Sequence, residues 1–296
     1  MGVLKTTMLL TGLTLLLGAM GMALDKVLGT GGLMTIVFLA VGIVMNWVSY
    51  FYSDKIVLKM YKARVVSERE APQLHQMVET LCARSGLPKP VIAIVPTDVP
   101  NAFATGRNPE HGVVAVTEGI LRALSYEELE GVVAHELGHI RNRDTLVSTV
   151  AASIAGAIGI MANVGQFGVL LGGGRDNGNG GNPIVLLVMA IVAPIVAMII
   201  QMAISRTREF GADRAAVEMT GNPDAMASAL NRIQSFAKNY QLPATPGTQH
   251  MFIINPLSGG GMSALLSTHP PTEKRIEAIM RLKQQGVGRN VRSAAV

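Results

Sequence analysis

The chain has 296 residues, of which 49% are hydrophobic and 15% are charged, and its formal net charge is +5 at pH 7. Soluble globular domains usually carry about 25% charged residues, so this composition argues against an ordinary soluble protein. The basic residues are not interleaved with aromatic residues in a patch, which argues against a nucleic-acid-binding protein.

The charged residues are missing from four long stretches. These are residues 6–24, 27–53, 145–174 and 177–205. Each is long enough for a transmembrane helix, which needs about 20 apolar residues. Buried core helices are the alternative, but globular helices seldom exceed about 20 residues. A signal peptide with Lys5 as its basic flank is a further alternative for the first stretch, yet no clean small-residue cleavage site precedes the second. We therefore expect four transmembrane helices in two hairpins.

Basic residues beside these stretches indicate the orientation, because Lys and Arg are enriched in cytoplasmic loops. They follow the second stretch, precede the third and follow the fourth: Lys55, Lys59, Lys62, Arg64, Arg69, Arg141, Arg143, Arg206, Arg208 and Arg214. The short loops on the other side hold only Lys26 and Arg175. We therefore expect residues 54–144 and 206–296 to face the cytoplasm, as should the N-terminus, with the positive charge anchoring the protein at the membrane surface.

The two cytoplasmic segments together have about 180 residues, a normal size for one domain. We predict one domain interrupted by the second hairpin. Its parts are hairpin 1–53, first domain segment 54–144, hairpin 145–205 and second domain segment 206–296. The single cysteine, Cys82, excludes an intrachain disulfide, which fits a reducing compartment, and we expect its thiol to be buried.

In the first cytoplasmic segment, the hydrophobic pattern predicts a helix over 67–85 that stops at Gly86. β-branched runs predict strands over 91–96 and 112–117, and the residues between them form a strand or a turn. The next helix begins at Ser125, and we expect it to run into the third apolar stretch because nothing interrupts it.

Ser125 and Glu128 fit a capping box at the start of that helix. In the second cytoplasmic segment, a helix continues from the fourth apolar stretch. Asn222 and Pro223 then fit the N-cap and first position of a further helix. The last predicted helix follows the sequence "STHPP" and stops at Gly286.

The helix after Ser125 contains the sequence "HELGH". Its histidines, His135 and His139, lie four residues apart, so they share one helix face and can both reach one metal ion. Glu136 lies between them, which completes the H-E-x-x-H pattern of zinc hydrolases. Zinc lowers the pKa of a bound water from 15.7 to about 7, and Glu136 would take its proton and pass it to the leaving amine. A chance match is the alternative, but the histidines interrupt an apolar run in which unpaired polar groups would be costly.

A third ligand is needed, because zinc in catalytic sites has three protein ligands and keeps one position for water. His75 lacks a partner at metal spacing and His111 lies in a polar loop, so we expect surface roles for both. Glu209 is well placed, because the second hairpin returns the chain to the membrane edge beside His139. Asp213 lies one turn further on and is a candidate hydrogen-bond acceptor for a ligand imidazole. A salt bridge with nearby arginines is its alternative role.

Four motifs, "AHELGHI", "SRTREFGAD", "NAFATG" and "THPPTEKRIEA", together resemble the HtpX family of membrane-bound zinc metallopeptidases. They occur in the family's order and spacing, and the similarity covers nearly the whole chain. The resemblance implies a gluzincin-type endopeptidase of the bacterial cytoplasmic membrane that acts in protein quality control. It implies one zinc ion per chain, held by His135, His139 and Glu209, with Glu136 catalytic.

The resemblance also implies a substrate-binding edge strand, which would pair with an extended peptide by strand addition. This strand comprises Asn101, Ala102, Phe103, Ala104 and Thr105. An ordinary hairpin rim is the alternative. His269, in "THPP", is expected near the active site, where it could donate to the tetrahedral oxyanion. A contact at a helix N-terminus is its alternative role.

Together these observations predict a mainly α, multi-pass membrane protein with four transmembrane helices and a cytoplasmic α+β zincin-like metallopeptidase domain. It would cleave misfolded or damaged membrane proteins. Its expected partners are protein substrates, the lipid bilayer and other membrane quality-control proteases, without nucleic acid.

Three other functions are weighed against this one. A prenyl-protein processing peptidase of the same wider group would need more spans and a large chamber. A non-enzymatic scaffold would have a degraded site, whereas the four motif residues are present. A metal transporter would place ionisable residues inside the spans, and there are none.

Overall fold

The computed structural model describes residues 29–146, 206–239 and 270–289, with scattered positions between 7 and 26 and residue 291. Apart from Thr145 and Leu146, the predicted third and fourth spans lie outside the described residues, and so does His269. The four-span arrangement and the domain boundaries therefore stay predictions.

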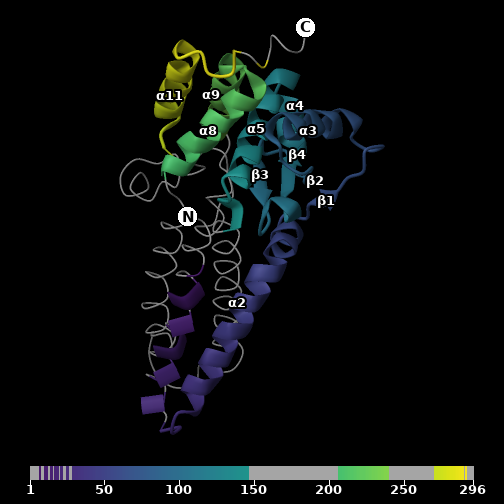
Figure 1. Cartoon of the computed structure of the whole chain (residues 1–296). Coiled ribbons are helices and arrows are strands. Elements are labelled where there is room, and N and C mark those ends of the chain that lie inside the picture. The colour runs from purple at the N-terminus through teal and green to yellow at the C-terminus, as the bar shows by residue number, and fades with distance from the viewer. Residues whose placement is uncertain are drawn as a thin grey trace.

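A long helix, α2 (Leu33–Met60), leads away from the α/β part of the molecule (Figure 1). Within the described part of the chain, one helical segment, Leu33–Tyr52, is long and apolar enough to cross a membrane. It coincides with the second predicted span. The carboxylate of Asp25 accepts hydrogen bonds from the backbone N–H groups of Met34 and Thr35, which would otherwise lack helical partners.

The described part contains a four-stranded sheet with the strand order β1-β2-β4-β3. Its strands are β1 (Arg64–Val65), β2 (Val91–Val95), β3 (Ala102–Thr105) and β4 (Val113–Thr117). β2 and β4 are parallel, and the other pairs are antiparallel. The predicted strands are confirmed within one residue at each end, whereas β1 is too short to leave a sequence pattern. β3 lies at one edge of the sheet.

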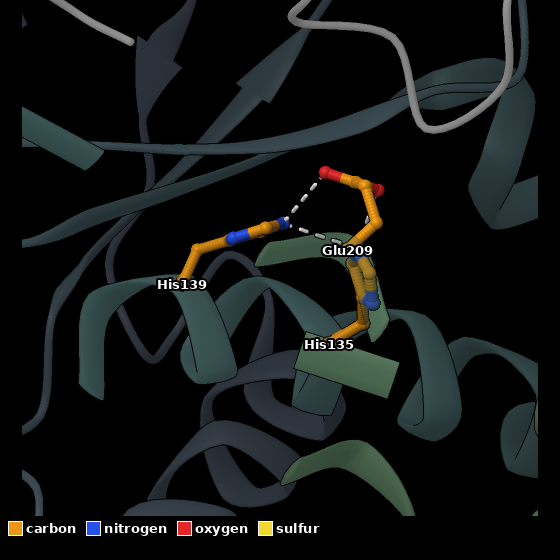
Figure 2. Close-up of side chains that lie close together, drawn as sticks. All are labelled: His135, His139 and Glu209. Carbon is orange, nitrogen blue, oxygen red and sulfur yellow. Dashed lines mark hydrogen bonds and ion pairs between the residues drawn. The ribbon is translucent and has the colours of Figure 1, made fainter. Parts of the chain in front are cut away.

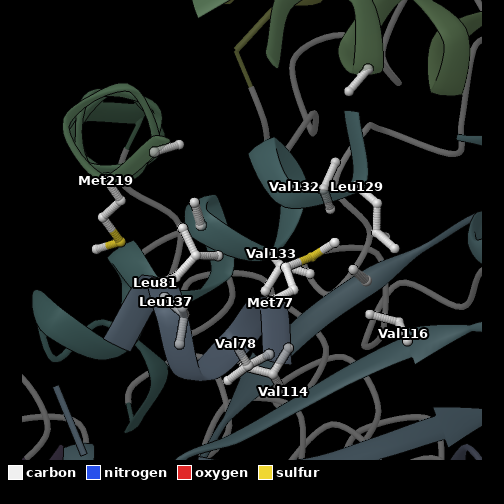
Figure 3. Close-up of a cluster of buried hydrophobic side chains, with 14 of the residues drawn as sticks. Met77, Val78, Leu81, Val114, Val116, Leu129, Val132, Val133, Leu137 and Met219 are labelled. Atoms are coloured by element: carbon white, nitrogen blue, oxygen red, sulfur yellow. The ribbon is translucent and has the colours of Figure 1, made fainter. Parts of the chain in front are cut away.

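Both faces of the sheet are covered, because side chains alternate between them along each strand. Val114 and Val116 of β4 point to a large core formed with two helices, α3 (Pro72–Ser85) and α5 (Tyr126–Arg141) (Figure 3). Val113 and Ala115 point to a smaller core against the end of α2. Cys82 is buried in the larger core as expected, and burial raises the pKa of its thiol to about 11.

Helix α3 begins at Pro72 and not at residue 67, because proline suits the first helical position and the preceding residues form a turn. A short helix that the sequence pattern did not indicate, α4 (Glu118–Ala123), follows β4 and precedes α5. The capping box of Ser125 and Glu128 at the start of α5 is confirmed.

The expectation that α5 runs on into the third span is wrong. The helix ends at Arg141, and Arg143 has a left-handed backbone with φ of 57°. The N–H of Arg143 bonds to the carbonyl of Ile140, and that of Asp144 bonds to the carbonyl of His139. These bonds satisfy the last helical carbonyls and turn the chain, as left-handed C-caps do.

Three further helices follow: α8 (Arg206–Thr220), α9 (Pro223–Asn239) and α11 (Thr272–Gln284). Two of them, α8 and α9, pack beside α5, and the third, α11, packs against α8 and α9 (Figure 1). Asn222 caps α9 through a hydrogen bond from the N–H of Ala225, as its sequence predicts. The described part is therefore mainly helical, with α5 central between the sheet and the later helices.

Candidate metal centre

Helices α5 and α8 bring together the two histidines of the H-E-x-x-H sequence and Glu209 (Figure 2). The Nε2 atoms of His135 and His139 lie 3.2 Å apart. The Glu209 carboxylate oxygens lie 3.6 Å from Nε2 of His135 and 3.5 Å from Nε2 of His139. Three potential ligand atoms thus lie within 4.8 Å of one another.

Asp213 fixes the orientation of the first histidine. Its Oδ1 lies 2.9 Å from Nδ1 of His135, and both side chains are 1% exposed. Because Nδ1 faces Asp213, Nε2 points toward Glu209 and His139. Burial and the neighbouring Arg275 lower the pKa of His135, but Asp213 and Glu209 outweigh them and raise it to about 9. Asp213 therefore contacts a histidine in the way expected for an outer partner of a metal ligand.

Asp213 also has an arginine partner, but that partner is distant in the sequence. Arg275 of α11 donates from Nε to one carboxylate oxygen at 2.9 Å and from a terminal nitrogen to the other at 2.7 Å. Burial opposes ionisation of Asp213, yet Arg275 and His135 together lower its pKa. The alternative role predicted for Asp213 is a salt bridge to an arginine nearby on the same helix. Asp213 does form a salt bridge, but its partner is Arg275 on another helix.

Arg275 is a residue of the site that was not predicted, although its spacing in the sequence carries a signal. Thr272, Arg275 and Ile279 follow a helical spacing, and all three are buried on α11. An arginine on an inward helix face is unusual, because buried charges require partners. That position alone could have marked Arg275 as a residue of a polar cluster.

Glu136 lies on α5 and is buried, with 5% of its surface exposed. Burial raises its pKa, although His135 and His139 oppose the shift. The backbone N–H of Ala104 in β3 donates to its carboxylate. Glu136 therefore faces the edge strand, and its raised pKa moves it toward the range in which a carboxylate acts as a general base at neutral pH.

The direction of the β3 backbone follows from its pairing with β4. Thr117 donates its N–H to the carbonyl of Asn101, and ladder bonds alternate along an antiparallel pair. Phe103 and Thr105, at even steps from Asn101, therefore bond to β4. The N–H and carbonyl groups of Ala102 and Ala104 point to the free edge, which agrees with the bond from Ala104 to Glu136.

The donor set fits a divalent metal ion. Glu136, Glu209 and Asp213 are buried carboxylates, and Arg275 is a buried guanidinium beside them. Metal binding requires neutral histidines, so it would displace the proton that the raised pKa of His135 favours. With the histidines then neutral and the carboxylates ionised, three negative charges and one positive charge leave −2 in this cluster, which a divalent cation neutralises. Two imidazoles and one carboxylate form a zinc ligand set of the kind found in metallopeptidases.

The other histidines differ from one another. His111 is exposed, as expected for a surface residue, and its Nδ1 lies 2.7 Å from the side chain of Asn108. His75 is partly buried, and its Nε2 lies 3.0 Å from the carbonyl of Val66, the residue that follows β1. A surface role for His75 is therefore wrong.

Comparison with protein families gives a match to the model described as "Peptidase family M48" over residues 68–283. The chain belongs to peptidase family M48. It is 49% identical over 282 residues to a protein named "Protease HtpX homolog" from Pyrococcus furiosus, covering 95% of this chain and 96% of the relative. It is 51% identical over 278 residues to a protein of the same name from Salinibacter ruber, covering 93% and 96%.

Among solved structures, one match is the crystal structure of S. mikatae Ste24p, with a TM-score of 0.48 and 18% sequence identity. The alignment covers 94% of this chain and 65% of that one. The family match and the curated relatives confirm the HtpX resemblance and make this chain a metallopeptidase. The scaffold and transporter alternatives are set aside, and the prenyl-protein alternative has less support than the HtpX assignment.

Proposed function

We propose that this M48 peptidase is a zinc endopeptidase that cleaves misfolded or damaged membrane proteins at the cytoplasmic face of the membrane. The observation that carries the proposal is the convergence of His135, His139 and Glu209 from two helices, with Glu136 on the same helix as the histidines. The set fits zinc in ligand type, spacing and charge.

In this proposal, His135, His139 and Glu209 hold one zinc ion per chain. When bound, the metal supplies a Lewis acid that polarises the peptide carbonyl and lowers the pKa of water. Asp213 keeps Nδ1 of His135 protonated, so that Nε2 is available as a ligand. Glu136 accepts the proton of the attacking water at its carboxylate and later donates it to the leaving amine.

We assign substrate binding to the strand segment Asn101–Thr105. The N–H of Ala102 and the carbonyls of Ala102 and Ala104 would pair with an extended peptide, because an edge strand offers such groups to an added strand. The Ala104 N–H that donates to Glu136 borders this edge, so a paired peptide would run beside the catalytic carboxylate. His269 is assigned to stabilising the oxyanion.

The proposed membrane arrangement has four spans, with 54–144 and 206–296 together forming the cytoplasmic peptidase domain. The distribution of Lys and Arg beside the apolar stretches supports it. Contacts between the end of α2 and β3 also support it. The ring of Tyr61, directly after α2, has its centroid 5.1 Å from that of Phe103 in β3. The edge strand would then lie close to the membrane surface, where segments of membrane proteins emerge. The relatives named "Protease HtpX homolog" support protein substrates.

The test is casein cleavage by the full chain in detergent, with zinc content measured for each variant. We expect Glu136→Gln to keep its zinc but lose about 100-fold to 10,000-fold in cleavage rate, because a general base is removed. His139→Ala should lose both zinc and activity. Glu127→Gln, on the exposed side of the same helix, is the matched control and should behave as wild type.

Equal cleavage by wild type and Glu136→Gln would overturn the assignment of Glu136. A wild-type protein that holds no zinc after exposure to it would overturn the metal assignment.

A further inference from the structure

Arg275 lies among the proposed metal ligands and is 1% exposed. It makes two hydrogen bonds to Asp213, and a terminal nitrogen lies 3.5 Å from a carboxylate oxygen of Glu209. Another terminal nitrogen lies 3.3 Å from Nδ1 of His135. These partners are 62 to 140 residues away in the sequence, so α11 reaches both halves of the site.

We propose that Arg275 is a positioning residue for the metal site: its guanidinium holds Asp213 in the orientation that directs Nε2 of His135 toward the metal. The inference rests on the proposed ligand set. It concerns how strongly this chain holds zinc, and it gives Arg275 no contact with substrate.

The planar guanidinium is suited to this task. Two parallel N–H···O bonds fix the plane of a carboxylate, whereas a single bond leaves it free to rotate. With Asp213 fixed, one of its oxygens lies 2.9 Å from Nδ1 of His135, and the imidazole cannot turn without breaking that contact. Losing an outer partner of a metal ligand typically weakens metal affinity by about 10-fold to 100-fold.

The positive charge of Arg275 and its positioning role have opposite effects on zinc affinity. Whether a variant binds zinc more weakly or more tightly than wild type therefore tells the two apart. A guanidinium beside the ligands repels a divalent cation, so by charge alone its removal would strengthen zinc binding. By positioning, its removal weakens zinc binding. A residue that served only to join α11 to α8 would change the stability of the metal-free protein without changing zinc affinity.

The experiment measures the zinc dissociation constant of metal-depleted full-length protein in detergent, by competition with a chromophoric chelator. We expect Arg275→Met to bind zinc about 10-fold to 100-fold more weakly than wild type. Arg275→Lys keeps the positive charge but cannot make two parallel hydrogen bonds to the Asp213 carboxylate, so it should also bind zinc more weakly than wild type. Arg281→Met, an exposed arginine on the same helix that pairs with Glu277, is the control and should match wild type.

A double mutant tests whether the effect passes through Asp213. Asp213→Asn should weaken zinc binding, and adding Arg275→Met should weaken it little further, because coupled residues are not additive. Thermal unfolding of each metal-free variant verifies that it is folded. If Arg275→Met does not fold, the zinc affinity of Arg275→Lys tests the proposal in its place.

Each other outcome has a defined meaning. Wild-type or tighter zinc binding by Arg275→Met would overturn the inference, as would full affinity in Arg275→Lys. Losses that multiply in the double mutant would show that Arg275 acts independently of Asp213, and would also overturn it. A wild-type protein that does not bind zinc contradicts the proposed function itself, so the two failures are distinguishable.

Discussion

At the scale of single residues, Glu128 links the start of the catalytic helix to a later helix. Its carboxylate accepts a hydrogen bond from the N–H of Ser125 at 2.8 Å, which completes the capping box of α5. The hydroxyl of Ser228 in α9 donates to its other oxygen at 2.6 Å. Burial raises the pKa of Glu128, but Ser228, Ser125 and Arg232 outweigh burial and lower it.

We expect Glu128→Gln to lower the free energy of unfolding by about 1 kcal/mol at pH 7, because the amide keeps the capping-box bond but loses the charge that strengthens the contacts with Ser228 and Arg232. The folded-state pKa lies below the unfolded value of about 4.3, so the stabilisation is complete above that value and is lost as the pH falls through the folded-state pKa. Thermal unfolding at several pH values should show wild type and variant converging below about pH 4. An exposed carboxylate variant, Glu277→Gln, should differ little from wild type. A constant difference between wild type and Glu128→Gln across this range would contradict the prediction.

At the scale of elements, the packing of α5 against α8 sets the distance between the histidines and Glu209. Gly138 allows this contact, because a Cβ built there would lie 2.9 Å from Cβ of Ala215 and 3.1 Å from Cα of Ala212. Carbon atoms pack best at about 3.5–4.0 Å. Ala212 lies three residues after Glu209 on the same helix, so a shift of α8 at this contact moves the ligand.

We expect Gly138→Ala to destabilise the protein and weaken zinc binding. Alanine in a helix interior normally gains about 0.5–1 kcal/mol over glycine, but overpacking costs about 1–3 kcal/mol. Gly211→Ala is the matched control on α8, because among the described residues a Cβ there would meet only a side-chain nitrogen of Asn142, at 3.5 Å. That variant should be more stable and keep its zinc affinity. Thermal unfolding and chelator competition measure both quantities, and a more stable Gly138→Ala with unchanged affinity would refute the role of this contact.

At the scale of the whole molecule, the α/β part lies at the C-terminal end of α2 (Figure 1). Its 28 residues span about 42 Å, which exceeds the roughly 30 Å hydrocarbon core of a bilayer. Exposed aromatic residues, Trp47, Tyr50, Phe51 and Tyr52, gather in its second half, as in the aromatic belts of membrane proteins. Arg107, after β3, lies over the ring of Phe51 at 5.7 Å. The edge strand is therefore joined to the part of α2 that would leave the membrane.

Trp47 is the single tryptophan of the chain, so tryptophan fluorescence reports on the environment of this position alone. In proteoliposomes we expect lipids with brominated acyl chains to quench it strongly and aqueous iodide to quench it weakly, because the residue lies in the candidate span. The control is Tyr126→Trp combined with Trp47→Phe, which moves the fluorophore to an exposed position at the start of α5. There iodide should quench and brominated lipid should not. If iodide quenches Trp47 as strongly as the relocated tryptophan and brominated lipid does not quench it, α2 does not enter the bilayer.

The arrangement of the proposed metal ligands on α5 could be predicted because it is local. Helix periodicity alone brings His135 and His139 to one face, and the cap at Ser125 defines where the helix begins. The strands were also predictable, because short runs of β-branched residues bounded by turn residues are typical of buried strands. The choice of Glu209 needed one further assumption, that a membrane hairpin returns the chain to the same edge.

Other features depended on contacts between distant segments, which local patterns do not encode. The partner of Asp213 lies 62 residues away on α11, and the end of α5 depends on a left-handed residue that its sequence does not demand. The two bonds of Arg275 and the close approach at Gly138 arise only when α5, α8 and α11 pack together. The sequence by itself thus determined the positions of His135, Glu136 and His139 on one helix, because hydrogen bonding within a helix sets their spacing. The tertiary structure decided that Asp213 and Arg275 surround the proposed ligands. A buried charge needs a partner that is close in space, and that partner can be distant in the sequence.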